Sequence, residues 1–157
     1  MQLVSEWIAT LPRSWQSKTH VNVGAQALAY AGAPLSPAQS RAFGVWNDWA
    51  DARIVTPTEI WIVEGKLVAT GAAYGQVLDY VAQYPQSADY QQFAPRAVVP
   101  IVLTMASRAF TANFFAKLGV RTILFQPSFP LSLALKKLFP AAQILTQGAL
   151  PVPEELA

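Results

Sequence analysis

The chain has 157 residues, a length that suits one domain with a single hydrophobic core. Its composition is 53% hydrophobic and 13% charged, against a usual charged share of roughly 25%, so we expect other subunits of a homo-oligomer or larger assembly to cover part of the surface. The absence of cysteine excludes disulfides, thiolate zinc sites and cysteine nucleophiles, and a net charge of +2 is too small to identify a nucleic-acid-binding protein by itself.

The apolar pattern does not indicate export or membrane insertion. The first residues, MQLVSEWIATLPRSW, lack the basic start and unbroken apolar core of a signal peptide. No segment reaches the roughly 18 apolar residues of a membrane-spanning helix. The longest apolar run, Ala97 to Ala106, has the length of a strand and contains Pro100. We therefore expect a soluble protein with no membrane partner, located in the cytoplasm or in a virion.

The first predicted element is a short amphipathic helix, Gln2 to Leu11, which Pro12 ends. One face of this helix carries Leu3, Val4, Trp7, Ile8 and Leu11. The next stretch, Val21 to Ala33, fits either a helix or a strand with a bulge, and the pattern does not choose between them.

A second helix is expected to begin at Ser36, which forms a capping-box pattern with Gln39 and precedes Pro37 at the first helical position. Its inner face carries Ala42, Phe43 and Trp46, with Trp49 as a further candidate. Because Trp7, Trp46 and Trp61 lie at core spacing, we interpret the tryptophans as core residues rather than as base-stacking groups.

Two strands joined by a tight turn follow this helix. The segment Asp51 to Val55 (DARIV) is short and becomes β-branched toward its end. The segment Ile60 to Val68 (IWIVEGKLV) is the strongest strand pattern in the chain. Between them, Thr56 to Glu59 predicts a turn whose bend Pro57 presets.

The next elements alternate between helix and strand. After Thr70, the sequence GAAYGQVLDYVAQY has helical spacing and stops at Pro85, and a polar loop runs from Ser87 to Pro95. Arg96 opens a strand whose body, AVVPIVLTM, is apolar on both faces and is therefore expected at the centre of a sheet. Its proline, Pro100, counts against that position because it cannot donate to a strand ladder.

The C-terminal part continues the alternation. We expect a helix from Ala109 to Leu118 that Gly119 closes, a buried strand from Val120 to Phe125, and a short helix from Leu131 to Leu138. The tail from Gly148 is Pro-rich and is expected to be extended or docked on a neighbour. From Ser36 onward this order predicts a single α/β domain over residues 1–157, a sandwich with a mixed central sheet flanked by helices.

Two charged side chains interrupt the strongest strand. Because side chains alternate between the two faces of a strand, Glu64 and Lys66 share one face with apolar neighbours. Burying a charge costs several kcal/mol unless it is paired or bound to a metal, so this placement requires compensation.

The preceding strand supplies a second carboxylate, Asp51, which could share a metal ion with Glu64. If the turn makes Val55 pair with Ile60, then Asp51 falls opposite Glu64. The two carboxylates, together with the backbone carbonyl of Gly65, would form a hard-oxygen site suited to Mg²⁺ or Mn²⁺.

These residues carry a family resemblance. Asp51, twelve intervening residues and then Glu64-Gly65-Lys66 resemble the signature of the PD-(D/E)XK nuclease superfamily, which has a restriction-endonuclease-like three-layer sandwich fold. Gln76 and Tyr80 (QVLDY) share a helix face and resemble the Q-x-x-x-Y element of the RecB-like branch. The resemblance covers Asp51 to Tyr80, about a fifth of the chain, and the strand and helix order that follows agrees with it.

The resemblance implies metal-dependent hydrolysis of DNA phosphodiester bonds, without a covalent intermediate. Asp51, Glu64 and the Gly65 carbonyl would hold one or two Mg²⁺ (or Mn²⁺) ions, which polarise the phosphate and lower the pKa of an attacking water. Lys66 would position or deprotonate that water and offset charge in the transition state. Gln76 would orient the water or a metal ligand, and Tyr80 would contact a backbone phosphate.

DNA is thus the implied partner, and the distribution of charge allows it. From Arg96 onward the acidic residues are Glu154 and Glu155, whereas the basic residues are Arg96, Arg108, Lys117, Arg121, Lys136 and Lys137. These residues form either a basic face for a polyanion or scattered solvating charges at helix and strand ends.

The sequence departs from the family pattern around this core. The family's Pro-Asp is Ala50-Asp51 here. Many relatives add an acid from the opening helix, for which Glu6 is the candidate, although it lies off the apolar face. His20 is either a metal ligand, as in some relatives, or a structural loop residue. Asp48 is either a group that supports the site or a solvated helix end.

Three functions stay open on this basis. The first is an active metal-dependent DNA nuclease. The second is a structural or assembly component, for example of a phage virion, that keeps the fold without catalysis; the low charge content and the Pro-rich tail favour it. The third is a small interaction domain in which an edge hairpin carries a Glu64–Lys66 surface pair and Tyr80 packs in the core.

Overall fold

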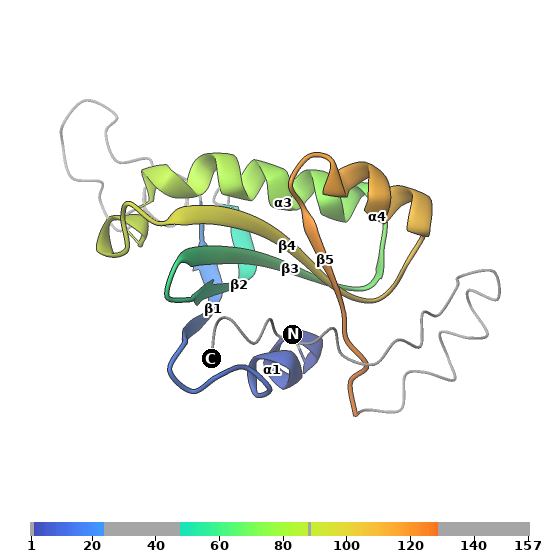
Figure 1. Cartoon of the computed structure of the whole chain (residues 1–157), viewed down its shortest axis with the longest axis horizontal. Helices are drawn as coiled ribbons and strands as arrows, with labels where there is room; N and C mark the ends of the chain where they lie inside the picture. The colour runs from blue at the N-terminus through green and yellow to red at the C-terminus, as the bar shows by residue number, and fades with distance from the viewer. Residues whose placement is uncertain (1, 24–47, 88, 129–157) are drawn as a thin grey trace, which may run out of the picture.

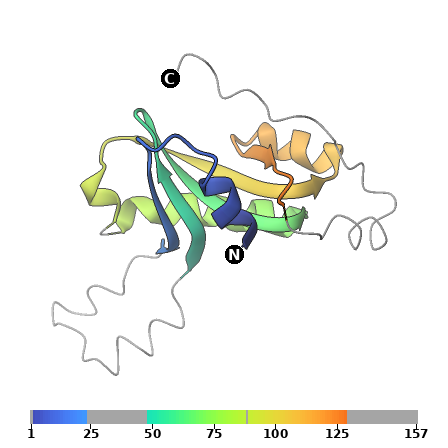
Figure 2. The same cartoon turned by 90° about the horizontal axis from the view of Figure 1, so that it is seen from below.

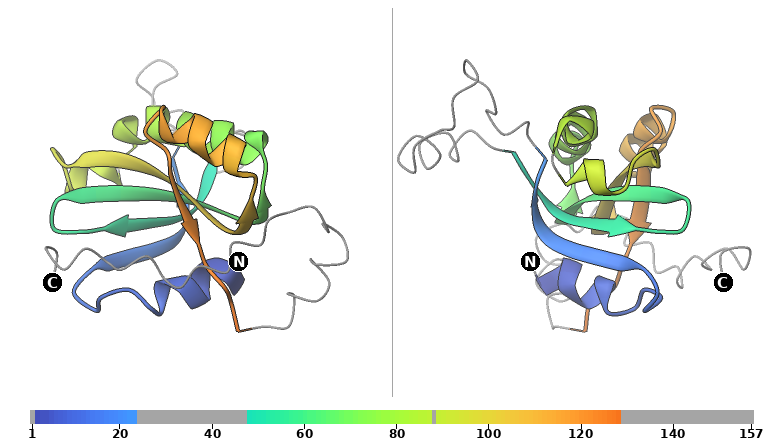
Figure 3. Two further views of the ribbon diagram at one scale, coloured as in Figure 1. Left: turned by 45° about the vertical axis from the view of Figure 1, so that its right-hand side comes forward. Right: turned by 90° about the vertical axis from the view of Figure 1, so that its left-hand side faces the viewer.

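The computed structural model describes residues 2–23, 48–87 and 89–128, and these residues build three layers around one sheet. Figure 1 shows the strands in the middle layer, helices α3 (Gly71–Gln83) and α4 (Ala109–Ala116) over one face, and helix α1 (Gln2–Ile8) under the other. The turned views in Figure 2 and Figure 3 show the same arrangement. The prediction of an α/β fold with helices flanking a mixed sheet is therefore confirmed.

The sheet has five strands in the order β1–β2–β3–β4–β5. The first three, β1 (Gln16–Asn22), β2 (Trp49–Val55) and β3 (Glu59–Ala69), form two antiparallel pairs. The last two, β4 (Ala97–Ser107) and β5 (Arg121–Leu124), continue the sheet in parallel pairing from β3. Parallel neighbours need a long crossover, and α3 and α4 supply the two crossovers.

Strand β1 is absent from the sequence-based prediction. Its sequence, QSKTHVN, exposes the first five residues and fully buries Val21, so it has no alternation that marks a strand. Pairing with β2 forms it instead, over the register from Gln16 opposite Val55 to Asn22 opposite Trp49. The ambiguous stretch that starts at Val21 thus begins as a strand, and its residues 24–33 lie outside the described part of the chain.

Helix α1 packs on the lower face of the sheet, as its apolar pattern predicts. Its buried residues are Leu3, Val4 and Trp7. They join a cluster with Trp15, Ala52, Ile54, Val63, Ile101, Leu103 and Met105. The half-buried Trp61 extends this cluster, with its ring 6.4 Å from that of Trp7 and edge-on to that of Trp15 at 5.2 Å.

Helix α3 packs on the upper face. Its buried side chains are Ala73, Tyr74, Val77 and Tyr80, which are spaced as one helix face. Tyr74, Val77 and Tyr80 form a second cluster with residues of β1, β2, β3, β4 and the segments next to them, namely Val21, Val23, Ala50, Ile60, Ile62, Ala69, Tyr84, Val102 and Val120. The buried hydroxyl of Tyr74 is satisfied by hydrogen bonds with Ser107 (2.9 Å) and Thr122 (3.0 Å), which join α3 to β4 and β5.

Strand β4 lies inside the sheet, as its two apolar faces predict. Pro100 is part of it, opposite Ile62 of β3. Strand β5 pairs with Ile101 to Thr104, so Pro100 lies just before the stretch that has a partner on both sides. Strand β5 itself is an edge strand with half-buried residues, and the prediction that it is buried is wrong because no strand covers its outer side among the described residues.

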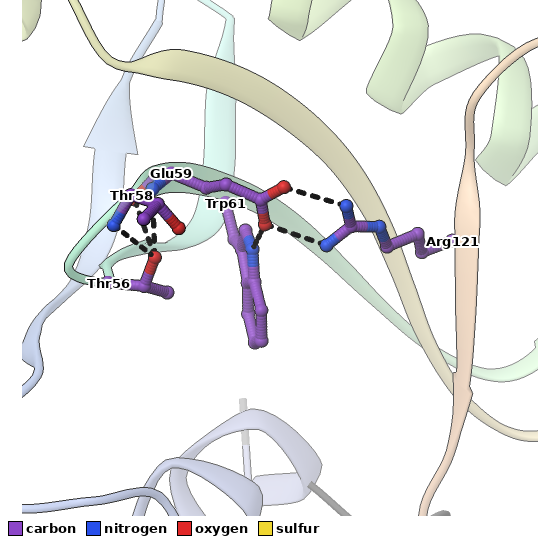
Figure 4. Close-up of polar contacts among 5 residues, drawn as sticks. All are labelled: Thr56, Thr58, Glu59, Trp61 and Arg121. Carbon is purple, nitrogen blue, oxygen red and sulfur yellow. Dashed lines mark hydrogen bonds and ion pairs between the residues drawn. The ribbon is translucent and has the colours of Figure 1, made fainter. Parts of the chain in front are cut away.

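An ion pair holds β5 to the sheet. The two terminal guanidinium nitrogens of Arg121 each lie 2.7 Å from a carboxylate oxygen of Glu59 (Figure 4). Because Glu59 is on β3, this ion pair reaches across β4. The indole nitrogen of Trp61 also donates to Glu59 at 2.7 Å. These contacts lower the pKa of Glu59, with the hydrogen bond from Arg121 as the main cause.

Some predicted elements lie outside the described residues. They are the helix from Ser36, the helix from Leu131 to Leu138 and the tail from Gly148. Among the described residues, no helix combines the length and the apolar character that crossing a membrane requires.

Candidate functional site

The turn between β2 and β3 determines which residues meet at the candidate site. The Thr56 hydroxyl accepts hydrogen bonds from the backbone N–H of Glu59 (2.9 Å) and Thr58 (3.3 Å), which closes the turn (Figure 4). Val55 then pairs with Ile60, and the ladder continues to Ala52 opposite Val63. The predicted pairing of Val55 with Ile60 is confirmed, whereas the ladder ends before the predicted pair of Asp51 and Glu64.

Beyond Ala52 and Val63, the Asp51 side chain replaces a backbone acceptor of the strand ladder. The Asp51 carboxylate accepts a hydrogen bond of 2.8 Å from the backbone N–H of Gly65. Asp51 thus lies at the point where β2 and β3 separate, beside the strand that carries Glu64 and Lys66. This position leaves the carboxylate half-buried between the two strands.

The β1–β2 pair changes face at the same level. Ala50 packs in the cluster under α3, whereas Ala52 packs in the cluster over α1, although residues two apart on a regular strand share a face. On β1, His20 stands opposite Asp51 between the paired residues Thr19 and Val21, and its φ is 53°. The left-handed backbone of His20 thus lies at the same level as the change of face on β2.

Glu64 is buried beside a half-exposed lysine. It is 2% exposed, and its Oε1 lies 2.6 Å from the Nζ of Lys66, two residues along the same face. Burial raises the pKa of Glu64, the hydrogen bond from Lys66 opposes that rise, and the charge of Asp51 adds to it. The pKa of Lys66 is raised mainly by its hydrogen bond with Glu64, and Asp51 contributes to the rise.

Helix α3 brings two further predicted residues to this place. The Gln76 amide donates a hydrogen bond to the phenolic oxygen of Tyr80, one helical turn further along. Burial raises the pKa of Tyr80, and the nearby charges of Glu64, Asp48 and Asp51 raise it further, so the ring hydroxyl lies within electrostatic reach of all three acids. The contacts of these predicted residues thus join Glu64 to Lys66, Asp51 to Gly65 and Gln76 to Tyr80.

The remaining sequence candidates have other partners. The Glu6 carboxylate accepts hydrogen bonds from the N–H (2.7 Å) and hydroxyl (3.0 Å) of Ser128, off the apolar face of α1 as expected. Asp48 directly precedes β2, and its carboxylate accepts from Gln83 of α3 at 2.9 Å. The helix whose end it was expected to form lies outside the described residues. The exposed ring of His20 stacks on Trp49 at 4.4 Å.

The donor set at this site suits a hard cation held mainly by water. Among residues 2–23, 48–87 and 89–128, no three histidine or acidic side chains converge on one point as a complete metal site. Asp51 and Glu64 supply two carboxylates, and Mg²⁺ is commonly held by one or two carboxylates while it keeps several waters. Burial raises the pKa of Glu64 despite the hydrogen bond from Lys66, and a divalent cation beside the carboxylate would lower it.

The sequence analysis missed a buried polar cluster on the α3 side of the sheet. Arg53 of β2 is 5% exposed and lies over the ring of Phe93 at 4.4 Å. Its Nε is 3.2 Å from Asp89, which also accepts from the Tyr84 hydroxyl at 2.7 Å and from Lys18 at 3.2 Å. An arginine inside the otherwise apolar DARIV strand is the signal that would have pointed to this cluster.

This cluster holds the connection from α3 to β4 against the hairpin. That connection contains two short 3-10 helices, Tyr84–Gln86 and Tyr90–Gln92, in the segment predicted as the end of a helix and a polar loop. The predicted stop at Pro85 agrees with the end of α3 at Gln83.

In comparisons with known proteins, no family model matches this chain, and no curated protein or solved structure matches it significantly.

Proposed function

We propose that this chain is a metal-dependent DNA nuclease of the PD-(D/E)XK type, with a restriction-endonuclease-like fold. The single observation that supports it most is the gathering of Asp51, Glu64 and Lys66 where β2 and β3 separate. A buried carboxylate with a raised pKa and a neighbouring lysine have a cost to the fold, and such groups are common at catalytic sites. The α/β architecture and the position of Gln76 and Tyr80 beside these acids agree with the proposal.

Asp51 and Glu64 would hold the ion, with the Gly65 carbonyl as the further ligand that the resemblance implies. A bound Mg²⁺ or Mn²⁺ would polarise the scissile phosphate and favour ionisation of a water. Because Gly65 donates its N–H to Oδ2 of Asp51, that hydrogen bond orients the carboxylate and leaves Oδ1 as the oxygen for a ligand. In the same way, Lys66 binds Oε1 of Glu64 and leaves Oε2.

The charge state and exposure of Lys66 indicate its role in the proposed reaction. Its pKa is raised, so Lys66 carries a full positive charge at neutral pH and is a poor general base. It is also the half-exposed member of the pair, with 44% of its side chain accessible against 3% for Glu64. We therefore assign Lys66 to binding a phosphate oxygen and offsetting negative charge in the transition state.

The different exposure of Gln76 and Tyr80 on α3 indicates different roles for these two side chains. Tyr80 is 4% exposed and accepts from Gln76, whose own position on α3 is exposed. Gln76 is thus the side chain that would reach a water or phosphate, and Tyr80 would hold its amide in place. This differs from the direct phosphate contact that the resemblance implies for Tyr80.

A cleavage assay tests the proposal. The purified chain is incubated with linear, nicked and branched DNA in Mg²⁺ or Mn²⁺, and Lys66→Met is compared with Arg13→Met, which changes an exposed basic residue between α1 and β1. We expect wild-type cleavage, a loss of roughly 10²–10³-fold in Lys66→Met and no loss in the control. Absence of wild-type cleavage on every substrate, or equal loss in both variants, would overturn the proposal.

One observation favours assembly as a second candidate function. Helix α4 exposes Phe110 (83%) and Phe114 (51%), which lie one turn apart, and Leu118 (52%) is exposed just beyond the end of the helix. With charged residues at 13% of the chain, a second copy is the occupant that this neutral apolar stripe suits best. Light scattering of wild type and Phe110→Ser tests this: a multimer that the substitution dissociates supports assembly, and a monomeric wild type rejects it.

A further inference from the structure

Two aromatic rings form an exposed stack beside the candidate site. The rings of His20 on β1 and Trp49 on β2 lie 4.4 Å apart with an interplanar angle of 10°. Trp49 is 39% exposed, and His20 is exposed as well. The other described tryptophans, Trp7, Trp15 and Trp61, pack in the cluster under the sheet. Trp49 therefore differs from them in presenting a ring to solvent.

The His20–Trp49 stack lies at the irregular part of the β1–β2 pair, where His20 has a left-handed backbone. His20 stands opposite Asp51, and Trp49 precedes Asp51 by two residues on the same strand, an interval of roughly 7 Å along an extended chain. The left-handed backbone of His20, with φ 53°, costs an ordinary residue on the order of 1 kcal/mol or more. Such a conformation persists where a particular side-chain direction is required, and here it brings the imidazole onto the indole.

We propose that the His20–Trp49 stack is a platform for an unpaired nucleobase, which rests on the proposed nuclease function and makes single-stranded DNA its substrate class. An exposed indole offers the large π-face on which bases stack with little sequence preference. A base held there would lie two residues along β2 from Asp51. A paired base inside a duplex has both faces covered by its neighbours, so the platform selects single strands or frayed ends.

Binding of DNA tests the platform without cleavage. Fluorescence anisotropy of a labelled oligothymidine is measured in Ca²⁺, which takes oxygen ligands as Mg²⁺ does, and a gel confirms that the DNA stays intact. The proteins are wild type, Trp49→Ala, Trp49→Phe and Phe110→Ala, the last being a matched control that removes an 83%-exposed ring from α4. Thermal unfolding confirms that each variant is folded.

We expect Trp49→Ala to weaken binding of the single strand about tenfold, in line with the loss of one stacked base. Trp49→Phe is expected to retain most of the affinity, Phe110→Ala all of it, and binding of a blunt duplex should not respond to Trp49→Ala. Three results would each overturn the platform: no binding of the single strand by wild type, equal affinities of wild type and Trp49→Ala, or an equal loss in Phe110→Ala.

The outcome is separable from that of the nuclease proposal. Single-strand binding that depends on Trp49, in a protein that cleaves nothing in Mg²⁺ or Mn²⁺, supports the platform and rejects catalysis. Cleavage that depends on Lys66, with single-strand binding indifferent to Trp49, supports catalysis and rejects the platform.

Discussion

The backbone N–H of Gly65 donates a 2.8 Å hydrogen bond to the side chain of Asp51, where a regular antiparallel pair would continue with backbone acceptors. The Asp51 carboxylate thus ends the backbone ladder between β2 and β3, and the hydrogen bond from Gly65 orients the carboxylate. A second constraint acts on Gly65, because a Cβ at this position would lie 2.5 Å from Cγ2 of Val4 in α1. The glycine between Glu64 and Lys66 therefore joins the candidate site to the packing of α1.

Gly65→Ala is expected to destabilise the fold. Its Cβ would overlap Val4 and approach Asp51 Oδ2 at 3.4 Å, so α1 must shift away from β3. We expect a loss of about 1–3 kcal/mol in the free energy of unfolding, measured by urea denaturation. Combining it with Val4→Ala, which removes the clashing methyl groups, should cost less than the sum of the two single changes.

The matched control is Gly75→Ala in the interior of α3, where an added Cβ meets nothing within 4 Å. It should be neutral or stabilise the protein by about 0.5–1 kcal/mol, because alanine is the better helix residue. If the two alanine variants were equally stable, close packing of Gly65 against Val4 would be rejected.

Glu64→Gln is expected to raise stability at neutral pH while it abolishes any metal-dependent activity. An acid whose folded pKa exceeds its ordinary value of 4.5 binds more protons in the folded chain, so wild-type stability falls as pH rises through the window between the two values. Glutamine does not titrate, so the stability of the variant relative to wild type should grow as pH rises from about 4 toward 7. Thermal unfolding across this range measures it, and a difference that shrinks with pH would contradict the raised pKa.

The Glu59–Arg121 pair should show the opposite pH dependence. The pKa of Glu59 is lowered by Arg121, so the pair stabilises the protein above the ordinary value of 4.5 and loses this effect as pH falls through the folded pKa. Because the Arg121 side chain is 52% exposed, we expect Arg121→Met to cost at most about 1 kcal/mol near pH 7. The gap to wild type should close as pH falls below 4.5 and through the folded pKa of Glu59, and a gap that stays constant would show that lost packing causes it.

Asp89→Ala should be among the most damaging changes outside the candidate site. It leaves the buried Arg53 without its counter-charge and removes the acceptor of the Tyr84 hydroxyl. Breaking a buried pair in this way costs about 3 kcal/mol or more. Lys18→Ala, which removes a 54%-exposed partner of the same carboxylate, should cost less than about 1 kcal/mol. Urea unfolding compares them, and similar losses would reject a structural role for the Arg53–Asp89 contact.

Local pattern was sufficient for the hairpin and the helix that follow one another in the middle of the chain. The turn at Thr56, the register that places Val55 opposite Ile60, and the shared face of Gln76 and Tyr80 depend on spacings of a few residues. These features could be predicted because strand alternation, helical period and turn chemistry are properties of neighbouring residues.

Elements whose stability comes from distant partners were not predictable in the same way. Strand β1 exists because β2 offers it a ladder, and its own residues are mostly polar and exposed. Trp49, a further candidate for the helix face in the sequence, begins β2, where its ring meets His20 from another strand.

The sequence by itself determined an α/β chain with a Glu64–Lys66 strand and a nearby Asp51, because these follow from short-range periodicity. Only the tertiary structure decided that the strands part at Asp51, that Arg53 is buried against Asp89 and that Trp49 stays exposed. Each of these outcomes depends on pairing between segments far apart in the chain, and the free energy of such contacts is not encoded in any one local window.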